Sequence, residues 1–292
     1  MKTIKAISIR RAVADLCVKA SIVLRPDVLA ALKRALAREQ NKRARHLLQV
    51  IIDNAACARA KSLAICQDTG MPVVFLEVGS NVKISGDLKL AVNRGVEDGY
   101  RSGCLRDSIV RDPLLRGKPG YAPAVIHIDI VPGSNLEISV LPKGFGSENK
   151  SQLKMFKPTV GIEEIKKFII EAVRSAGPDA CPPYIIGVGI GGTADYACLL
   201  AKKALLRKLT ANGERRTADD PSAALGASKR LTAKLERELL RAINNLNIGP
   251  MGLGGKTTAL AVHIETYPTH IAGLPVALNI SCHALRSASI IL

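Results

Sequence analysis

Cysteine is the residue type whose surroundings in this sequence most suggest chemistry. Three of the seven cysteines lie in apolar, helix-like segments, where a thiol is usually an inert small hydrophobe: Cys17, Cys57 and Cys198. Cys104 stands at a helix end and is ambiguous. Three others stand at the edge of a regular element, beside turn-forming or polar residues: Cys66, Cys181 and Cys282. Because there is no C-x-x-C pair, a metal site would need cysteines far apart in the sequence. The residues alone leave a metal site and simple packing equally open.

Two glycine-rich segments resemble phosphate-binding motifs. Gly187-Val-Gly-Ile-Gly-Gly192 matches G-x-G-x-x-G between a predicted strand and a predicted helix, the setting of a dinucleotide-binding turn. No acidic ribose ligand follows about twenty positions later, so a tight turn facing an anion is the alternative reading. Gly254-Gly-Lys-Thr257 resembles the end of a P-loop, but Pro250 occupies the first glycine position and a strand-like run follows. We reject the P-loop and keep a nucleotide-binding module as an alternative function.

The charge balance calls for a partner or an explanation. The 292 residues carry 42 Lys and Arg against 25 Asp and Glu, a net charge of +17. The basic residues are dispersed, with the densest run at 33–45, and aromatic residues are scarce, which disfavours nucleic-acid binding. A basic surface, an acidic partner or an anionic substrate would account for the charge. With neither a membrane-length apolar segment nor a signal-peptide pattern, we expect a cytoplasmic protein.

Hydrophobic periodicity predicts the elements that position these residues. Residues 1–62 form a helical N-terminal portion, in which Pro26 opens an amphipathic stretch. Further helices are predicted over 87–101, 163–175, 194–210 and 228–245. Strands are predicted over 72–78, 184–188, 258–265 and 274–280.

A hairpin and a surface excursion complete the predicted fold. Two strands, 124–131 and 136–141, flank the turn-forming Pro132-Gly-Ser-Asn135 and predict a hairpin. Residues 211–226 are polar and rich in Pro, Gly and Asp, which is typical of a surface excursion. The sequence therefore predicts an α/β to α+β fold, with mixed sheets and a hairpin flanked by several helices, in a single large domain covering 1–292.

Four long motifs carry a resemblance to a known family over nearly the whole chain. They are Cys66-Gln-Asp-Thr-Gly70, Pro142-Lys-Gly-Phe-Gly-Ser-Glu-Asn-Lys-Ser151, Gly187-Val-Gly-Ile-Gly-Gly-Thr193 with Ala201-Lys-Lys-Ala-Leu205, and Gly249-Pro-Met-Gly-Leu-Gly-Gly-Lys-Thr257 continuing through Pro268-Thr-His270 to Ser281-Cys282-His283. In this order they resemble the alpha subunit, or N-terminal domain, of the iron–sulfur-dependent class I fumarases and L-tartrate dehydratases.

The resemblance implies a 4Fe-4S cluster bound by Cys66, Cys181 and Cys282. Three cysteines leave one iron with an open position, which suits Lewis-acid chemistry better than electron transfer. The implied activity is reversible removal of water from a 2-hydroxy dicarboxylate, with malate to fumarate placed first and tartrate to oxaloacetate second.

The resemblance also assigns residues to the substrate. Asp68 and His270 take catalytic roles: Asp68 handles the proton of the leaving hydroxyl or orients its acid/base partner, and His270 forms a hydrogen bond to the substrate or tunes an acid. Gln67, Arg106 and Gly146 bind the substrate, and Arg106 clamps a carboxylate.

Each of these residues also has a structural alternative. Asp68 could stabilise a turn, Arg106 could form a surface ion pair, and His270 could be a satisfied core histidine. Lys150 and Lys256 suit either a dianionic substrate or the surface, and His283 suits a supporting role beside the cluster.

Single-chain members of the family continue into a second domain with further anion-binding residues and the base. We therefore expect this chain, which ends ten residues after Cys282 (292 − 282 = 10), to need a separate beta subunit. The expected assembly is an α2β2 heterotetramer with a second alpha subunit.

Overall fold

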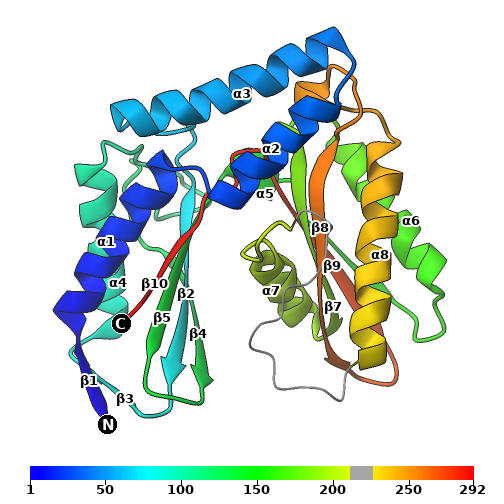
Figure 1. Cartoon of the computed structure of the whole chain (residues 1–292). Coiled ribbons are helices and arrows are strands. Elements are labelled where there is room, and N and C mark those ends of the chain that lie inside the picture. Colours follow the sequence, from blue (N-terminus) through cyan, green and yellow to red (C-terminus); the bar gives the residue numbers. More distant parts are fainter. Residues whose placement is uncertain (211–225) are drawn as a thin grey trace. The chain divides into compact units, whose positions relative to one another are not determined.

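The computed structural model describes residues 1–210 and 226–292, which form two compact units, each with its own four-stranded sheet (Figure 1). The first unit consists of Met1–Arg25, Asn54–Phe145 and Arg286–Leu292. The second unit consists of Pro26–Asp53 and Gly146–Leu285. The predicted mixture of helices and mixed sheets is confirmed. The assignment of 1–292 to one domain stays a prediction, and the excursion expected at 211–226 lies, except for residue 226, outside the described residues.

The N-terminal portion is helical apart from one short strand. The strand β1 (Lys2–Lys5) leads into the helices α1 (Ala6–Ile22), α2 (Pro26–Arg38) and α3 (Lys42–Lys61). Pro26 begins α2 because its fixed φ suits the first helical position and its missing N–H is not needed there. None of the described helices combines the length and the apolarity needed to cross a bilayer.

The first unit is built on the strand order β10-β5-β2-β4. Its strands are β2 (Met71–Gly79), β4 (Val125–Val131), β5 (Leu136–Lys143) and β10 (Ala288–Ile291), while β3 (Val82–Ser85) pairs with β1 in a separate small sheet. The central strand β2 runs parallel to β4 and antiparallel to β5. The sheet packs through alternate residues such as Val74, Leu76 and Ile138 against α1 and α4 (Leu88–Ser102).

The predicted hairpin over 124–141 is wrong. β4 and β5 follow one another in the chain, but both pair with β2, which lies between them. The turn expected at 132–135 instead wraps the end of β2: the Gly79 N–H donates to Asn135 O (2.8 Å) and the Asn81 N–H donates to Gly133 O (2.9 Å). A turn signal identifies where the chain reverses, and the pairing partner is decided by tertiary contacts.

Two glycines let α1 and α4 approach closely. A Cβ on Gly95 would lie 2.5 Å from Arg10 O, and a Cβ on Gly99 would lie 2.5 Å from Ala14 O. Each would collide with the backbone of the facing helix, so the missing side chains set the spacing between the two helices.

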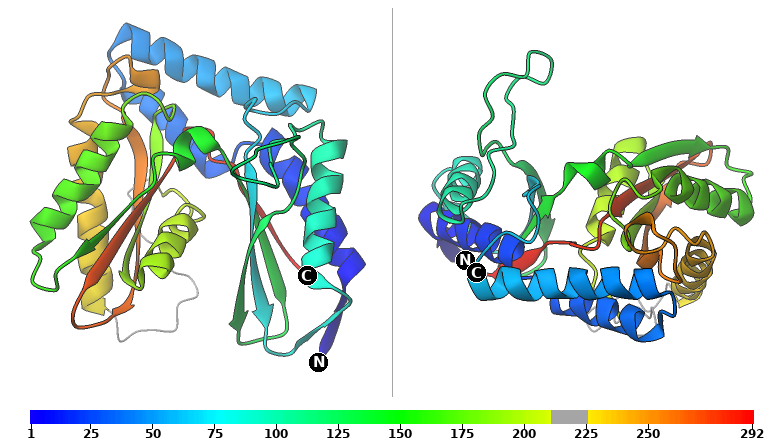
Figure 2. Two further views of the ribbon diagram at one scale, coloured as in Figure 1. Left: turned by 180° about the vertical axis from the view of Figure 1, so that it is seen from behind. Right: turned by 90° about the horizontal axis from the view of Figure 1, so that it is seen from above.

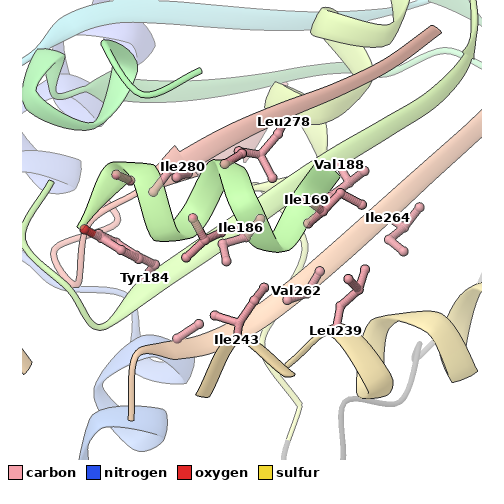
Figure 3. Packing of buried hydrophobic residues seen from close by; sticks show 14 of the residues in the cluster. Ile169, Tyr184, Ile186, Val188, Leu239, Ile243, Val262, Ile264, Leu278 and Ile280 are labelled. Atoms are coloured by element: carbon pink, nitrogen blue, oxygen red, sulfur yellow. The ribbon is translucent and has the colours of Figure 1, made fainter. Parts of the chain in front are cut away.

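The second unit has the strand order β6-β9-β7-β8 and helices on both faces of its sheet. Its strands are β6 (Gln152–Phe156), β7 (Tyr184–Gly192), β8 (Ala259–Thr269) and β9 (Leu274–Ser281). The helices α6 (Ile162–Ala176) and α8 (Gly226–Asn244) pack on one face, and Figure 3 shows Ile169 of α6 and Leu239 of α8 among core residues of the strands such as Val188 and Val262. The helix α7 (Ala194–Ala204) packs on the other face of the sheet; the left view of Figure 2 shows the molecule from behind.

The G-x-G-x-x-G motif lies within β7 and is not a turn after a strand. A Cβ on Gly187 would lie 2.0 Å from Ala201 O, and one on Gly189 would lie 2.0 Å from Ala197 O. Without side chains at these two glycines, α7 can pack closely against the strand. The predicted tight turn at 187–192 is wrong, because these residues belong to β7. The contact accounts for both glycines without a nucleotide.

Candidate active site

The motif that begins at Cys66 forms a turn between α3 and β2 in the first unit. Cys66 is half-buried, and its thiol lies 3.6 Å from the Oε1 atom of the exposed Gln67. The Asp68 carboxylate accepts the Gly70 N–H at Oδ1 (3.0 Å) and the Phe145 N–H at Oδ2 (2.8 Å). Asp68 thus has the turn-stabilising role considered from the sequence, and its proton-handling role stays a prediction.

Hydrogen bonds from Thr69 and Tyr100 hold the same turn in place. The Thr69 hydroxyl donates to Arg106 O (3.2 Å) and accepts the Arg106 N–H (3.0 Å). The Tyr100 hydroxyl donates to Thr69 O (3.0 Å) and is shared with Gly70 O (3.1 Å). Burial raises the pKa of Tyr100, so the hydroxyl remains a donor. The turn and the backbone of Arg106 are therefore held together.

The Arg106 side chain is exposed, and among the residues the structure describes its guanidinium has no hydrogen-bond or ion-pair partner. The surface ion pair considered as its alternative is therefore not formed within residues 1–210 and 226–292. A fixed backbone beside an uncommitted guanidinium suits the binding of an external carboxylate.

Two buried cations stand beside the Cys66 turn, and sequence reasoning gave neither a role. Arg286 is 3% exposed and donates from Nη1 to Asp68 O (2.6 Å), while its Nε is buried without a partner in the described residues. Lys143 is 2% exposed, and its Nζ donates to Gly144 O (3.4 Å). A Cβ on Gly144 would lie 3.2 Å from both Arg286 Nη2 and Asp68 Oδ2, so this glycine keeps the two groups uncrowded.

Buried Lys and Arg side chains are rare and usually serve a purpose. The signals available in the sequence were position only: Lys143 lies inside a motif, and Arg286 follows Cys282 by four residues.

The second unit brings Cys181 and Cys282 together. His283, directly after Cys282, donates its backbone N–H to Cys181 O (3.3 Å), and its Nδ1 lies 3.0 Å from the same oxygen. Both cysteines are half-buried. Tyr184 lies beside them, and burial raises the pKa of its hydroxyl, with smaller contributions from the two thiols. Two of the three predicted ligands therefore lie close together, linked through His283, whose supporting role beside a cluster stays a prediction.

Other motif residues of the second unit have mostly structural contacts. Gly146 lies in the short helix α5 (Phe145–Glu148), and a Cβ there would be 3.9 Å from Asp179 O. Lys150 forms an ion pair with Asp179 (2.8 Å). The Lys256 N–H donates to a Glu39 carboxylate oxygen (2.7 Å), and its Nζ donates to a Gln40 side chain. The surface alternatives for Lys150 and Lys256 agree with these contacts.

The second unit does not bring His270 near Cys282. His270 is exposed beyond the end of β8, and its Nδ1 accepts the Ala272 N–H (3.2 Å). Cys282 follows the opposite end of β9, an eight-residue strand, so about 25 Å of extended chain separates the two residues. Because His270 is exposed, it is not the core histidine considered from the sequence. Because β9 separates it from Cys282, the two residues do not share a site within this unit.

Comparison with known proteins decides the family. The profile of the family described as fumarate hydratase (Fumerase) matches residues 10–291. The chain belongs to this fumarate hydratase family. A Methanocaldococcus jannaschii protein provisionally named L(+)-tartrate dehydratase subunit alpha is 42% identical over 284 residues, 94% of each chain. Proteins named L(+)-tartrate dehydratase subunit alpha from Escherichia coli strain K12 and Shigella sonnei are each 31% identical over 269 residues, 91% of this chain and 84% of theirs.

Membership of the fumarate hydratase family makes the chain part of a hydro-lyase, as the resemblance predicted. The seven cysteines, all within the described residues, form no disulfide. Burial raises the pKa of Cys17 to about 12, which keeps that thiol protonated at neutral pH.

The donor set fits an iron–sulfur cluster of the fumarate hydratase type. Cys66, Cys181 and Cys282 are the three half-buried cysteines, which is the exposure expected of thiolates that line a cofactor pocket. Within 1–210 and 226–292, no three His, Cys, Asp or Glu side chains are grouped to hold a single metal ion. A donor set of thiols alone also suits iron–sulfur clusters better than Mg²⁺ or Ca²⁺.

Proposed function

We propose that the chain is the alpha subunit of a 4Fe-4S hydro-lyase that reversibly removes water from a 2-hydroxy dicarboxylate. The observation that carries the proposal is the pairing of Cys181 and Cys282 through His283 in a member of this family. Cys66 is the proposed third ligand. Malate was the first expectation from the sequence, and the names of the relatives favour L-tartrate, so both belong in the first assay.

The cluster would supply a Lewis-acidic iron with an open position for the departing hydroxyl group. Arg106 would bind a substrate carboxylate through both arms of its guanidinium, since its side chain has no competing partner in the described residues. Asp68, oriented by the Gly70 and Phe145 N–H groups, would accept or return the hydroxyl proton. Gln67 and the Gly146 backbone would contribute hydrogen bonds to the substrate.

Cysteine variants test the ligand assignment. After anaerobic reconstitution, C66S, C181S and C282S chains should lose most of their iron and brown colour, whereas C198S should match the parent because Cys198 is exposed on α7. Air should bleach the parent chain and stop the activity of its complex with the beta subunit, and iron with thiol should restore both. Equal iron content in all four variants would rule out the proposed ligands.

We further propose that a second alpha subunit supplies His270. Because β9 separates His270 from Cys282 within the unit, His270 reaches a cluster that includes Cys282 only from another copy of the chain. Co-expressing differently tagged H270A and C282S chains together with the beta subunit tests this. Each variant alone should be inactive, while purified mixed pairs should regain activity because one site has both an intact cluster and an intact His270. Inactive mixed pairs of normal size would contradict the proposal.

The loop between α4 and β4 suits a contact with a beta subunit. It projects beyond the sheet in the right-hand view of Figure 2 and carries Leu114 and Leu115, which are 89% and 84% exposed. Asp112 holds its tip by accepting the N–H groups of both leucines (2.8 Å each). An L114S/L115S chain should keep its fold and its iron but bind the beta subunit at least tenfold more weakly in pull-down titrations.

A further inference from the structure

A basic cavity in the second unit has no place in the function proposed above. It has a volume of about 270 Å³ and lies between α2, α8 and β8. Four arginines line it, Arg34 and Arg38 from α2 and Arg237 and Arg241 from α8. Each pair is spaced i, i+4, so both members lie on the same face of their helix. Two helices thus present guanidinium groups to one space.

The four guanidinium groups are not neutralised by the described part of the chain. None of them has a hydrogen bond or an ion pair with residues 1–210 or 226–292. The one acidic residue among the lining residues, Glu236, is 3% exposed and already committed. It accepts Arg207 Nη1 (2.6 Å), Arg207 Nη2 (3.4 Å) and the Ile264 N–H (2.7 Å). Within residues 1–210 and 226–292, the cavity therefore carries a positive charge that no acidic side chain of the lining neutralises.

The rest of the lining favours a small anion over a base or a ring. No Phe, Tyr or Trp contributes to the lining, so nothing offers a stacking surface for a nucleobase. His263, the one ring present, is buried and lies 3.1 Å from Ala204 O through Nδ1. The volume of about 270 Å³ lies just below the range of about 300–1,000 Å³ for ligand pockets, which suits a small ligand. Arginine forks match phosphate oxygens in pairs and hold them more specifically than lysine does.

We propose that this cavity binds a compact anion bearing phosphate groups, held between the arginines of α2 and α8. The site also gives part of the +17 net charge a location, since Arg34 and Arg38 belong to the densest basic run of the sequence. Like charges that face one another across the cavity repel, and a bound polyanion relieves this repulsion while tying α2 to α8.

Calorimetric titration of the full chain with inorganic pyrophosphate tests the proposal. Binding should saturate at one pyrophosphate per chain, and sodium chloride at matched ionic strength should give no saturable heat. R237Q/R241Q should weaken the affinity at least tenfold, and R34Q/R38Q, which changes only the other helix, should do the same. R43Q/R59Q removes equal charge from exposed positions of α3 outside the cavity and should stay within twofold of the parent.

Three results would overturn the proposal. The first is equal weakening in R43Q/R59Q, which would indicate a general effect of charge. The second is the absence of saturable heat with pyrophosphate. The third is a single-stranded RNA that binds through the same arginines and that pyrophosphate does not displace. Circular dichroism of each variant confirms the fold, and because the cavity variants leave the three candidate cluster cysteines untouched, their iron content reports separately on the proposed function.

Discussion

The sheets of the two units have the same strand arrangement, but they differ in the residues that stand next to the start of the central strand. In the first, β2 is parallel to β4 and antiparallel to β5, whose outer neighbour is β10. In the second, β7 is parallel to β8 and antiparallel to β9, whose outer neighbour is β6. In each sheet the start of the central strand therefore lies opposite the end of its antiparallel neighbour.

The candidate site residues occupy matching positions in this strand arrangement. Cys66 precedes β2 and Cys181 precedes β7. The segment after β5 contacts the first turn through Phe145, and the segment after β9 contacts Cys181 through His283. The difference lies after the antiparallel strand, where the second unit has Cys282 and the first has Gly144. The same strand arrangement therefore carries one candidate thiol beside buried cations in the first unit and two candidate thiols in the second.

The largest expected effect contrasts the glycines that let helices approach in each unit. Gly187→Ala should lower the free energy of unfolding by about 3–5 kcal/mol, because its Cβ would meet Ala201 O at 2.0 Å. Gly95→Ala should cost less, about 1–3 kcal/mol, since its clash is milder and Ala favours the helix by about 1 kcal/mol. Gly120→Ala, with nothing within 4 Å, is the matched control. Urea unfolding measures all three, and equal losses at Gly187 and Gly120 would contradict the packing explanation.

The next effect concerns Arg286, one of the buried cations of the first unit. Arg286→Met should cost about 2–3 kcal/mol, because Asp68 O loses a charged donor and the turn that carries Cys66 loosens. Iron should also leave the reconstituted protein faster. Arg111→Met, an exposed change in the same unit, should alter stability by less than about 0.5 kcal/mol. If the two variants unfold at the same urea concentration, Arg286 does not hold the turn.

The equivalent contact of the second unit should be weaker. His283→Ala removes the Nδ1 interaction with Cys181 O but keeps the backbone N–H bond to the same oxygen, so we expect a loss of about 1 kcal/mol. Urea unfolding beside Arg286→Met gives the comparison directly. If His283→Ala lowered the free energy of unfolding more than Arg286→Met does, the contact in the second unit would be the stronger one, contrary to this expectation.

Local patterns in the sequence predicted the elements but not their partners. The helix expected over 163–175 and the strand expected over 274–280 match α6 and β9 closely, because each has a long, regular apolar period. The edge strands β6 and β10 were missed since most of their residues are exposed and only pairing with β9 and β5 defines them. The hairpin failed for the same reason, as nothing local says that β2 lies between β4 and β5.

Local sequence patterns singled out the candidate cysteines but did not assign their role. Cys66, Cys181 and Cys282 stood out by their positions at element edges, and the structure leaves all three half-buried; their role as cluster ligands came from the resemblance and stays a prediction. Lys143 and Arg286 were missed because Lys and Arg are normally exposed, and no local signal reports their burial. His270 shows the limit of a resemblance, which assigned it to the same site as Cys282, whereas the structure places the two residues at opposite ends of β9.

The smallest expected effect is an exposed ion pair between the two helices of the first unit. Arg10 donates to Asp98 (2.5 Å), and this hydrogen bond lowers the pKa of the Asp98 carboxyl below its usual value of 3.8. A lowered folded-state pKa means that the contribution is present above the unfolded value and is lost as the pH falls through the folded value. Asp98→Asn should therefore lower the melting temperature slightly near neutral pH and not at all in strong acid. Because both side chains are about 40% exposed, water and salt screen the pair, and about 0.5 M salt should shrink the difference at neutral pH. A difference that persisted in strong acid would show that Asp98 stabilises the α1–α4 contact by packing, as Gly95 and Gly99 do, and not by charge.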